Sequence, residues 1–552
     1  MPQHLASVRL SDSRDGRNIG PRMGRGLRFA RTGGGEARIV SISVLDDRVT
    51  AAVEPGPPPA RPWDAASVAL LAVAVSAAGA ARPSLWFDEA ATISAATRSV
   101  PALWRMLGNI DAVHGVYYLL MHGWFAVFGA TEFASRLSSA LAVGLAAGGV
   151  VVLGRQISTR AVAVTAGLVF AILPRVTWAG METRSYALSM AAAVWLTVFC
   201  VTAARHGRGR WWLGYGLLLS VATLLNVFLL LIVPAHAMAV VAFGRSPGIW
   251  RQWAIAAAAA TAATMPFLIF SQSQLFQVGW ISSLGAHTVG QVLGVQYFDL
   301  SMPAAVLAGV ILAGGIARGL RTADAHPGRL VWLTVTWMLV PTAILLGYSA
   351  LRQPIYYPRY LTFTTPAAAL LLGLCVVAIG RSRAGIAVVL TVCAAVAAPS
   401  YLAQRGPYAK ADMDYSAVAD VIDRYAAPGD CLVLDNSTTW KPGPIRPLTA
   451  ARPAVFAKLH DYGLGRTALQ RNRLWDSHIA IWAWADKLPD CPALWTVSER
   501  DPTLPDHQRG SALDPGSRLG RAMAYQVPSR FGFHVVERWQ FSFAQVAKSV
   551  QD

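Results

Sequence analysis

Charged residues are scarce in this chain. Only 14% of its 552 residues are Asp, Glu, Lys or Arg, whereas soluble globular proteins carry about 25%. Hydrophobic residues make up 54% of the chain, and its mean hydropathy is +0.41. This composition excludes an ordinary soluble fold and predicts a polytopic α-helical membrane protein.

Several common metal-binding and nucleotide-binding motifs are also missing. The sequence contains no CxxC pair, no HExxH motif and no P-loop, so zinc-dependent hydrolysis and ATP-driven transport lack support. Of the five cysteines, Cys200, Cys375 and Cys393 fall in apolar stretches and are expected to be packing residues. Cys431 and Cys491 fall in a polar region, where oxidising conditions would permit a disulfide, although their spacing does not establish one.

The net charge of +18 reflects arginines placed between the apolar runs and in the N-terminal tail. This distribution is typical of membrane topology and of contact with anionic lipid headgroups, so no nucleic-acid partner is expected. Residues 1–62 are rich in Arg, Gly and Pro and lack the apolar core of a signal peptide. We expect them to form a disordered cytoplasmic tail.

The first insertion signal is the apolar run from Ala65 to Ala81, which follows the basic tail and should leave the N-terminus in the cytoplasm. When basic connectors are placed inside, the parity of the spans requires that the apolar stretch 114–130 does not cross. We therefore expect it to be a juxtamembrane helix in a first external loop, 82–135, of a membrane domain, 63–402. About eleven spans are predicted: 65–81, 136–154, 161–178, 185–204, 211–224, 226–243, 252–270, 302–319, 329–349, 360–380 and 385–402.

Polar residues of both signs collect on the predicted external side. Ionisable groups at membrane depth are costly, so such a group predicts a functional site. Single arginines and tyrosines at span ends are also common as interfacial anchors, but adjacent acids gain nothing from that position. The residues are Asp88, Glu89, His114, Tyr117, Arg136, Glu182, Arg184, Tyr186, Arg352, Tyr356, Tyr357 and Arg359.

Five strings in this order resemble the GT-C glycosyltransferases, and within them the branch of protein O-mannosyltransferases and lipid A aminoarabinose transferases. They are Leu85 to Glu89 (LWFDE), His114 to Leu120 (HGVYYLL), Glu132 to Leu137 (EFASRL), Glu182 to Leu188 (ETRSYAL) and Pro358 to Leu361 (PRYL). The resemblance covers roughly residues 65–400. It implies a GT-C fold with juxtamembrane helices in the first external loop and transfer of a sugar from a polyprenyl-phosphate carrier on the non-cytoplasmic face.

The chemistry of such a transfer suggests roles for these residues. A carboxylate can take the proton of an attacking hydroxyl, and arginines can bind the departing phosphate. Asp88 is the first candidate base and Glu89 the second. Arg136, Arg184 and Arg359 are candidate phosphate ligands, with Arg352 and His114 as further ones, although Gly115-Val116 follows His114 where relatives often carry Pro-Pro. Sugar or acceptor contacts are assigned to Glu182, Tyr117, Tyr186 and Tyr357.

No metal site is predicted, although the family has metal-dependent branches and a divalent cation near Asp88 and Glu182 stays possible. Residues 403–552 are polar and predict a small extracytoplasmic α/β domain. Its expected elements are a helix from Tyr415 to Tyr425 and strands at Cys431–Leu434, His478–Trp484 and His534–Trp539. Its tryptophans could stack on carbohydrate or serve as core and membrane contacts: Trp440, Trp475, Trp482, Trp484, Trp495 and Trp539.

The sequence thus predicts a glycosyltransferase (EC 2.4) in the plasma membrane. Its expected partners are the bilayer, a polyprenyl-phosphate sugar and a cell-envelope glycan, glycolipid or protein acceptor. Mannose or arabinose is the expected sugar, with inversion at the anomeric carbon, and the Ala, Arg and Gly bias suggests an actinobacterium. Two alternatives stay open. A flippase or transporter of lipid-linked sugars should show internal repeats or polar residues at mid-membrane depth. A non-catalytic scaffold would leave the external charges unexplained.

Overall fold

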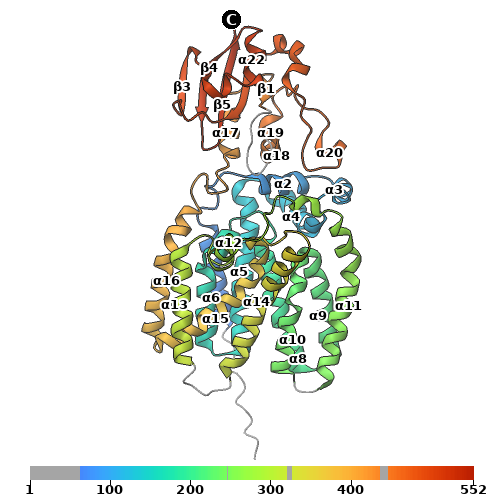
Figure 1. Cartoon of the computed structure of the whole chain (residues 1–552), viewed down its shortest axis with the longest axis vertical. Helices are drawn as coiled ribbons and strands as arrows, with labels where there is room; N and C mark the ends of the chain where they lie inside the picture. Colours follow the sequence, from blue (N-terminus) through green and yellow to red (C-terminus); the bar gives the residue numbers. More distant parts are fainter. Residues whose placement is uncertain (1–61, 245–246, 320–325, 436–445) are drawn as a thin grey trace, which may run out of the picture. The chain divides into compact units, whose positions relative to one another are not determined.

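The computed structural model describes residues 62–244, 247–319, 326–435 and 446–552. The expected disordered tail, apart from Pro62, and Trp440 lie outside the described residues. Up to residue 403 the described chain is helical, and a sheet follows after residue 430 (Figure 1). The helical elements are α1 (Pro62–Ala77), α2 (Phe87–Ala96), α3 (Val100–Leu107), η1 (Ala112–His114), α4 (Gly115–Phe128), α5 (Glu132–Ile157), α6 (Arg160–Ile172), α7 (Pro174–Ala179), α8 (Tyr186–His206), α9 (Gly209–Leu225), η2 (Val227–Ile232), α10 (Val233–Phe243), α11 (Pro247–Gln272), η3 (Leu275–Val278), α12 (Ala286–Gly290), η4 (Gln291–Val295), α13 (Met302–Gly319), α14 (His326–Leu351), η5 (Pro358–Thr364), α15 (Thr365–Gly380) and α16 (Arg383–Ala403).

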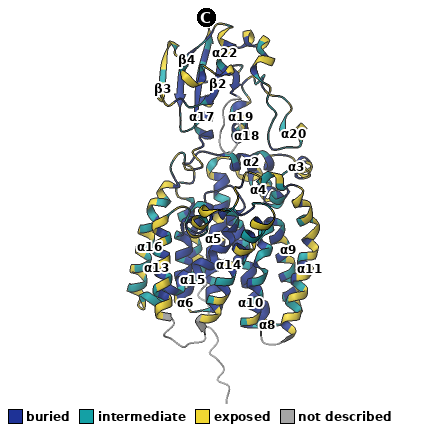
Figure 2. Cartoon of the chain, in the orientation of Figure 1, coloured by how far each residue is buried: buried dark blue, intermediate teal, exposed yellow. Residues whose placement is uncertain are grey.

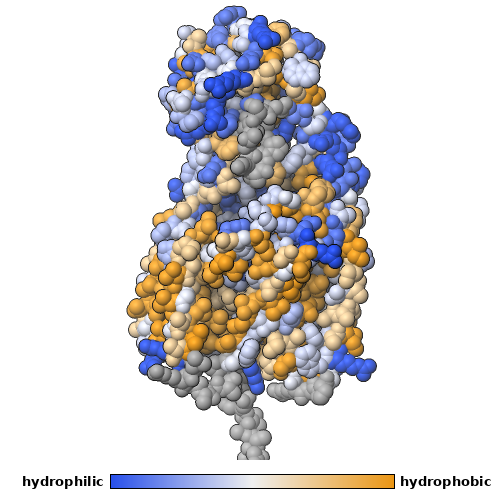
Figure 3. Space-filling model, viewed as in Figure 1, coloured by the Kyte–Doolittle hydropathy of each residue, from blue (hydrophilic) through white to orange (hydrophobic). Residues whose placement is uncertain are grey.

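Six helices in the described part of the chain are long and apolar enough to cross a membrane, and five shorter apolar helices accompany them. Hydrophobic residues gather on the face formed by these helices, whereas hydrophilic residues dominate the surface of the part that holds the sheet (Figure 3). The six are Glu132–Ile157, Tyr186–His206, Gly248–Gln272, Gly328–Leu351, Pro358–Gly380 and Arg383–Ala403. The prediction of a helical protein with several membrane-spanning segments is thus confirmed, although the number of eleven spans is not.

Each predicted span contains a helix, but the first, predicted at 65–81, already ends at Ala77, and another is interrupted. The span predicted at 161–178 stops at Ile172, and α7 starts at Pro174. Leu173 is extended, with ψ of 128°. Proline disfavours the helical region for the residue before it, so the chain breaks there and restarts with Pro174 in the first turn of α7.

Small residues let the inner helices approach closely. A Cβ atom on Gly144 of α5 would lie 2.9 Å from the carbonyl oxygen of Ala69 in α1, and one on Gly149 would lie 2.6 Å from Val194 in α8. Close backbone approach through small residues is the usual means of packing helices in lipid. Figure 2 accordingly shows α5 and α15 largely buried, while α11, α13 and α16 carry many exposed residues.

The segment 82–135, predicted to be the first external loop, contains four helical elements before α5 begins. The stretch expected as a juxtamembrane helix is α4, which begins at Gly115 and ends at Phe128. Before it, α2 buries eight of its ten residues, and α3 buries Leu103 and Met106 while Trp104 is exposed. This loop therefore folds into a packed unit that can hold side chains in fixed positions.

The C-terminal part contains a five-stranded sheet in the order β1-β2-β5-β4-β3, with β1 and β2 parallel and the other pairs antiparallel. The predicted helix Tyr415–Tyr425 (α17) and strand Cys431–Leu434 (β1) are confirmed, as is the strand at 534–539, which runs from Phe533 to Gln540 (β4). The remaining elements are α18 (Pro447–Ala451), α19 (Pro453–Phe456), α20 (Ala468–Arg471), η6 (Ile481–Ala483), η7 (Ala485–Asp490), β2 (Leu494–Glu499), β3 (His507–Leu513), α21 (Gly516–Leu519), α22 (Met523–Ser529) and β5 (Ala544–Gln551).

The predicted strand at His478–Trp484 is wrong. His478 forms only an isolated bridge with Leu464, and residues 481–483 form the 3-10 helix η6. The place beside β1 is taken by β2, whose residues pair with β1 from Leu494 to Val497. A strand requires a paired neighbour, and this segment has none in the sheet.

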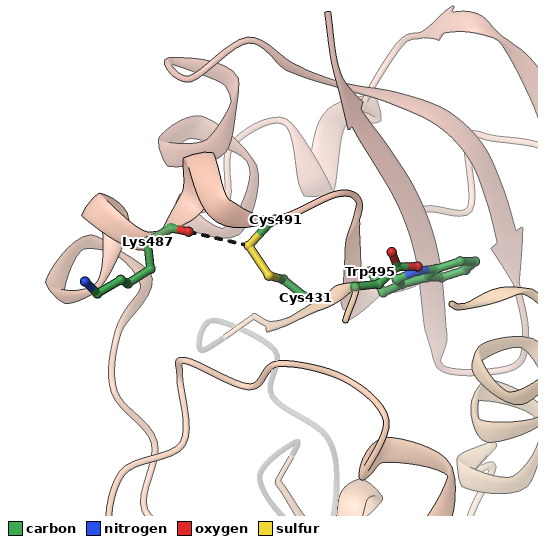
Figure 4. Close-up of a disulfide and its surroundings, with 5 residues drawn as sticks. Cys431, Lys487, Cys491 and Trp495 are labelled. Carbon is green, nitrogen blue, oxygen red and sulfur yellow. Dashed lines mark hydrogen bonds between the residues drawn. A yellow bond between two sulfur atoms is a disulfide. The ribbon is translucent and has the colours of Figure 1, made fainter. Parts of the chain in front are cut away.

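A disulfide joins Cys431 at the start of β1 to Cys491 just before β2, with 5.6 Å between their Cα atoms (Figure 4). Both residues are buried, and the bridge closes 60 residues of chain. Replacing both cysteines by alanine should lower the free energy of unfolding of this part by about 2–4 kcal/mol. Thermal unfolding of the full chain, followed by a probe in the C-terminal part, measures this. An unchanged unfolding midpoint in the variant would contradict this prediction. As a control, a reducing agent should lower the unfolding midpoint of the wild type and leave that of the variant unchanged.

Candidate active site

The two adjacent carboxylates of the first loop lie in the first turn of α2. Trp86 is extended before this helix, so Asp88 and Glu89 occupy its N-terminal turn, where the helix dipole favours negative charge. Successive helical residues point about 100° apart. The two carboxylates therefore face different partners, and the structure gives them different surroundings.

Glu89 is locked into a buried ion pair with Arg136 of α5. Arg136 donates from Nε to Oε1 at 2.8 Å and from Nη2 to Oε2 at 2.6 Å, and both side chains are fully buried. Thr183 also donates to Glu89 Oε1 from its backbone N–H and its hydroxyl, each at 3.2 Å. The other guanidinium N–H groups of Arg136 donate to the carbonyl oxygens of Ala80, Pro83 and Ser84. All five donors of Arg136 are thus engaged.

Asp88 has a different environment, because two guanidinium groups face its single carboxylate. Arg359, at the start of η5, lies 3.0 Å from Oδ2 through Nη1, and Arg184 lies 3.8 Å from Oδ1 through Nη2. The Asp88 side chain keeps 10% of its surface exposed. Residues far apart in the sequence, from α2, the α7–α8 turn and η5, meet here.

Glu182 has its own cation, which sequence reasoning missed. Lys410 Nζ donates to Oε1 at 2.5 Å, and Trp86 Nε1 donates to Oε2 at 3.1 Å. Glu182 is fully buried and the Lys410 side chain is 3% exposed. Lys410 lies beyond the last predicted span, so motif order gave no reason to place it here. The available signal was that it is the first lysine of the chain.

A second row of polar groups supports Arg184. Its Nη1 donates to Tyr118 Oη at 3.1 Å, and Tyr118 donates to Asp111 Oδ2 at 2.6 Å. Asp111 has a positive φ of 60°, and burial raises its pKa. Neither Tyr118 nor Asp111 was predicted. His114 Nε2 lies 3.4 Å from Arg184 Nη2, and burial together with Arg184 and Arg359 holds the pKa of His114 well below its usual range. Its surroundings therefore favour the neutral form of His114.

Aromatic rings surround Arg359. Its guanidinium carbon lies 4.9 Å from the ring centre of Tyr357, 5.6 Å from Trp86 and 5.8 Å from Trp280. Such rings stabilise a cation without consuming its hydrogen-bond donors. Of the other predicted residues, Tyr186 is buried against Trp178. Arg352 is exposed at the end of α14 and takes part in none of the contacts described for this cluster.

Several buried polar atoms in the cluster have no hydrogen-bond partner. They include His114 Nδ1, the Tyr117 hydroxyl, Arg184 Nε and Arg359 Nε. Leaving buried donors and acceptors unpaired is costly, so such groups are typical of a site that completes its hydrogen bonds with a ligand. Here the unpaired donors include two from permanently charged guanidinium groups, which points to an anion.

The carboxylates do not form a ligand set for a divalent cation. Glu89 and Glu182 are each bonded to a buried cation, and Asp88 faces two. Within the described residues, no group of three His, Cys, Asp or Glu side chains is arranged to hold a metal ion.

Comparisons with known proteins give a family match and a fold. Residues 115–270 match the family model described as dolichyl-phosphate-mannose-protein mannosyltransferase. The chain is similar to ArnT from Cupriavidus metallidurans at 14% identity, with a TM-score of 0.54 for the apo state and 0.52 for the form bound to undecaprenyl phosphate. These alignments cover 87% and 88% of this chain and 97% of the ArnT chain.

Two further comparisons give weaker similarity or none. Arabinofuranosyltransferase AftD from Mycobacteria aligns at 16% identity over 89% of this chain and 40% of its own, with a TM-score of 0.46. A search of curated proteins found no match. The predicted resemblance to the GT-C glycosyltransferases is thus confirmed, by the family match over residues 115–270 and by the fold shared with ArnT.

Proposed function

We propose that this protein transfers a monosaccharide from a polyprenyl-phosphate carrier to a hydroxyl acceptor, with Asp88 as the general base. The observation that carries this proposal is the arrangement of two arginines around a single carboxylate, with unpaired donors beside it. The family match and the fold shared with ArnT, which was solved with undecaprenyl phosphate bound, support a lipid-phosphate donor.

Arg184 and Arg359 are the proposed ligands of the donor phosphate. Each has an unpaired Nε donor, and guanidinium groups bind phosphate through paired N–H groups while staying protonated. Arg136 cannot serve in this way without losing bonds that it already makes. We assign Arg136 and Glu89 to positioning α2. His114, in its neutral form, would contribute a hydrogen bond and no charge.

The proposed reaction is a single displacement. The acceptor oxygen attacks the anomeric carbon, the bond from that carbon to the phosphate oxygen breaks, and the acceptor proton passes to Asp88. The electron pair leaves with the phosphate, where Arg184 and Arg359 stabilise the charge. A bound phosphate competes with Asp88 for both guanidinium groups, so donor binding would also release the carboxylate to act as base. Direct displacement inverts the anomeric centre.

The proposal also includes several details that were predicted from the sequence. They are a mannose or arabinose donor, an acceptor in the cell envelope, and about eleven spans with a cytoplasmic N-terminus and an external C-terminal domain from residue 403. Helices at every predicted span support the count. The disulfide supports an oxidising location for the C-terminal part. Tyr117, Tyr186 and Tyr357 remain proposed sugar or acceptor contacts. Glu182 was assigned the same role, but its two oxygens already accept from Lys410 and Trp86, so we assign it to positioning instead.

Arg359 and Arg352 offer a matched comparison seven residues apart. Replacing Arg359 by glutamine should weaken donor binding by about 10- to 100-fold, because a hydrogen bond to a charged group contributes about 1.5–3 kcal/mol. Arg352→Gln should bind the donor like the wild type, since its side chain is exposed and outside the cluster. Titration of both variants with a polyprenyl phosphate in nanodiscs measures this. Equal affinities would remove Arg359 from the phosphate site.

The proposed function is tested by asking which class of sugar donor the protein uses. Purified protein in nanodiscs is given labelled polyprenyl-phosphate sugars or nucleotide sugars, with a membrane extract as acceptor pool. We expect labelled product and free polyprenyl phosphate only from the lipid-linked donors. Transfer from nucleotide sugars would contradict the proposal. Movement of intact donor across the bilayer without transfer would favour the flippase alternative.

A further inference from the structure

Lys410 follows a segment that is hydrogen-bonded to the end of α1 and to the residues before α2. Arg405 donates to the carbonyl oxygens of Ala78 and Val75 at the end of α1, both at 2.7 Å. Two residues beyond, Pro407 accepts from the backbone N–H of Ser84 at 2.7 Å. These contacts bring the chain that follows the last helix of the bundle beside the segment that leads into α2.

The backbone directly after Lys410 is held in an unusual conformation. Ala411 and Asp412, the two residues that follow it, have φ of 52° and 58°. Non-glycine residues rarely adopt this region, and such conformations persist where the surrounding structure imposes them, often at functional sites. These two residues turn the chain directly after Lys410, whose side chain is buried against Glu182.

Glu182 connects Lys410 to the proposed phosphate site. One oxygen of Glu182 accepts from Lys410 and the other from Trp86 Nε1, and Arg359 lies over the ring of Trp86 at 5.6 Å. Glu182 is also two residues from Arg184 in the sequence. Without a cation of its own, this buried carboxylate would attract the same arginines that face Asp88.

We propose that Lys410 is a positioning residue for the transfer reaction: by neutralising Glu182, it leaves Arg184 and Arg359 free for Asp88 and the donor phosphate. The inference rests on the proposed function and extends it to a residue outside the membrane spans. It makes the catalytic cluster depend on the C-terminal segment, which no sequence motif indicated.

The test compares single and double variants of Lys410 and Glu182 in the whole chain, so that the charge of each partner is removed separately and together. Lys410→Met leaves Glu182 uncompensated and should raise the donor KM and lower kcat, together by about 10²-fold, as expected for misplaced binding groups. Glu182→Gln in the same chain removes the uncompensated charge, so the double variant should recover most of the loss. Lys410→Arg keeps the charge and should stay active. Lys487→Met is the control, because Lys487 is exposed and outside the cluster.

Each outcome decides the inference. Wild-type kinetics in Lys410→Met would overturn it. A folded double variant that stays as slow as Lys410→Met would also overturn it, because charge balance would then not be the cause. If Lys410→Met does not fold, the double variant and Lys410→Arg still give a decision. A wild type that transfers no sugar at all rejects the proposed function itself, which separates that failure from this one.

Discussion

Replacing Asp88 by asparagine is expected to lower the transfer rate by about 10²–10⁴-fold while the protein stays folded and binds its donor. The amide keeps the shape of the carboxylate but cannot accept the proton of the attacking hydroxyl. Donor binding should be unchanged or tighter, because Arg184 and Arg359 then face no competing negative charge. Steady-state transfer and donor titration of the same preparation measure the two effects.

The control for this prediction is Asp486→Asn, in which an aspartate with a side chain that is 71% exposed changes outside the cluster. It should transfer sugar like the wild type. Full turnover by Asp88→Asn would show that Asp88 is not the base. Loss of donor binding together with turnover would instead indicate that Asp88 holds the donor.

The largest expected effect on stability is at Glu89. Glu89→Gln leaves the guanidinium group of Arg136 buried without a counter-charge, and breaking a buried ion pair in this way costs about 3–5 kcal/mol. Arg136 also binds three carbonyl oxygens just before α2, so the entry to that helix should loosen. Thermal unfolding and monodispersity in detergent measure the loss.

Glu132 provides a matched comparison, because it begins the same helix as Arg136 and pairs with Arg452 at 2.6 Å in a partly exposed position. Glu132→Gln should lower the unfolding temperature less than Glu89→Gln does, since water can replace the lost partner. An equal shift for both variants would contradict the structural role given to the Glu89–Arg136 pair. Wild-type stability of Glu89→Gln would do so too.

The order of the motifs was enough to predict that Asp88, Arg184 and Arg359 meet. The three lie at helix ends, and helices that alternate in direction bring every second end to the same face. Such topology depends on apolar length and on the placement of basic connectors, both of which can be read from the sequence. The helices at every predicted span follow from the same signals.

The pairing of side chains within the cluster could not be predicted in this way. Glu89 and Arg136 were separate candidates for base and phosphate ligand, yet their side chains bond to each other. Which of two adjacent acids faces a given arginine depends on the rotation of α2, and this is set by packing in three dimensions. Lys410 escaped prediction for the same reason, since its partner lies 228 residues earlier in the chain.

The sheet shows another limit of prediction from the sequence. A strand is recognised by alternation, but its existence depends on a neighbour that local sequence does not specify. Residues 478–484 have suitable side chains and remain unpaired in the sheet, while β2 and β5 were not predicted and form its centre. The strand β1 was easier to identify because all four of its residues are buried, which gives a continuous apolar run.

The proposed function requires Asp88 to act as the base in sugar transfer from a donor held by Arg184 and Arg359. The most direct measurement is a single turnover, in which protein loaded with labelled lipid-linked sugar is mixed with acceptor and the label is followed into product. We expect rapid transfer by the wild type and retention of bound donor by Asp88→Asn. Equal rates of label transfer by the two proteins would contradict it.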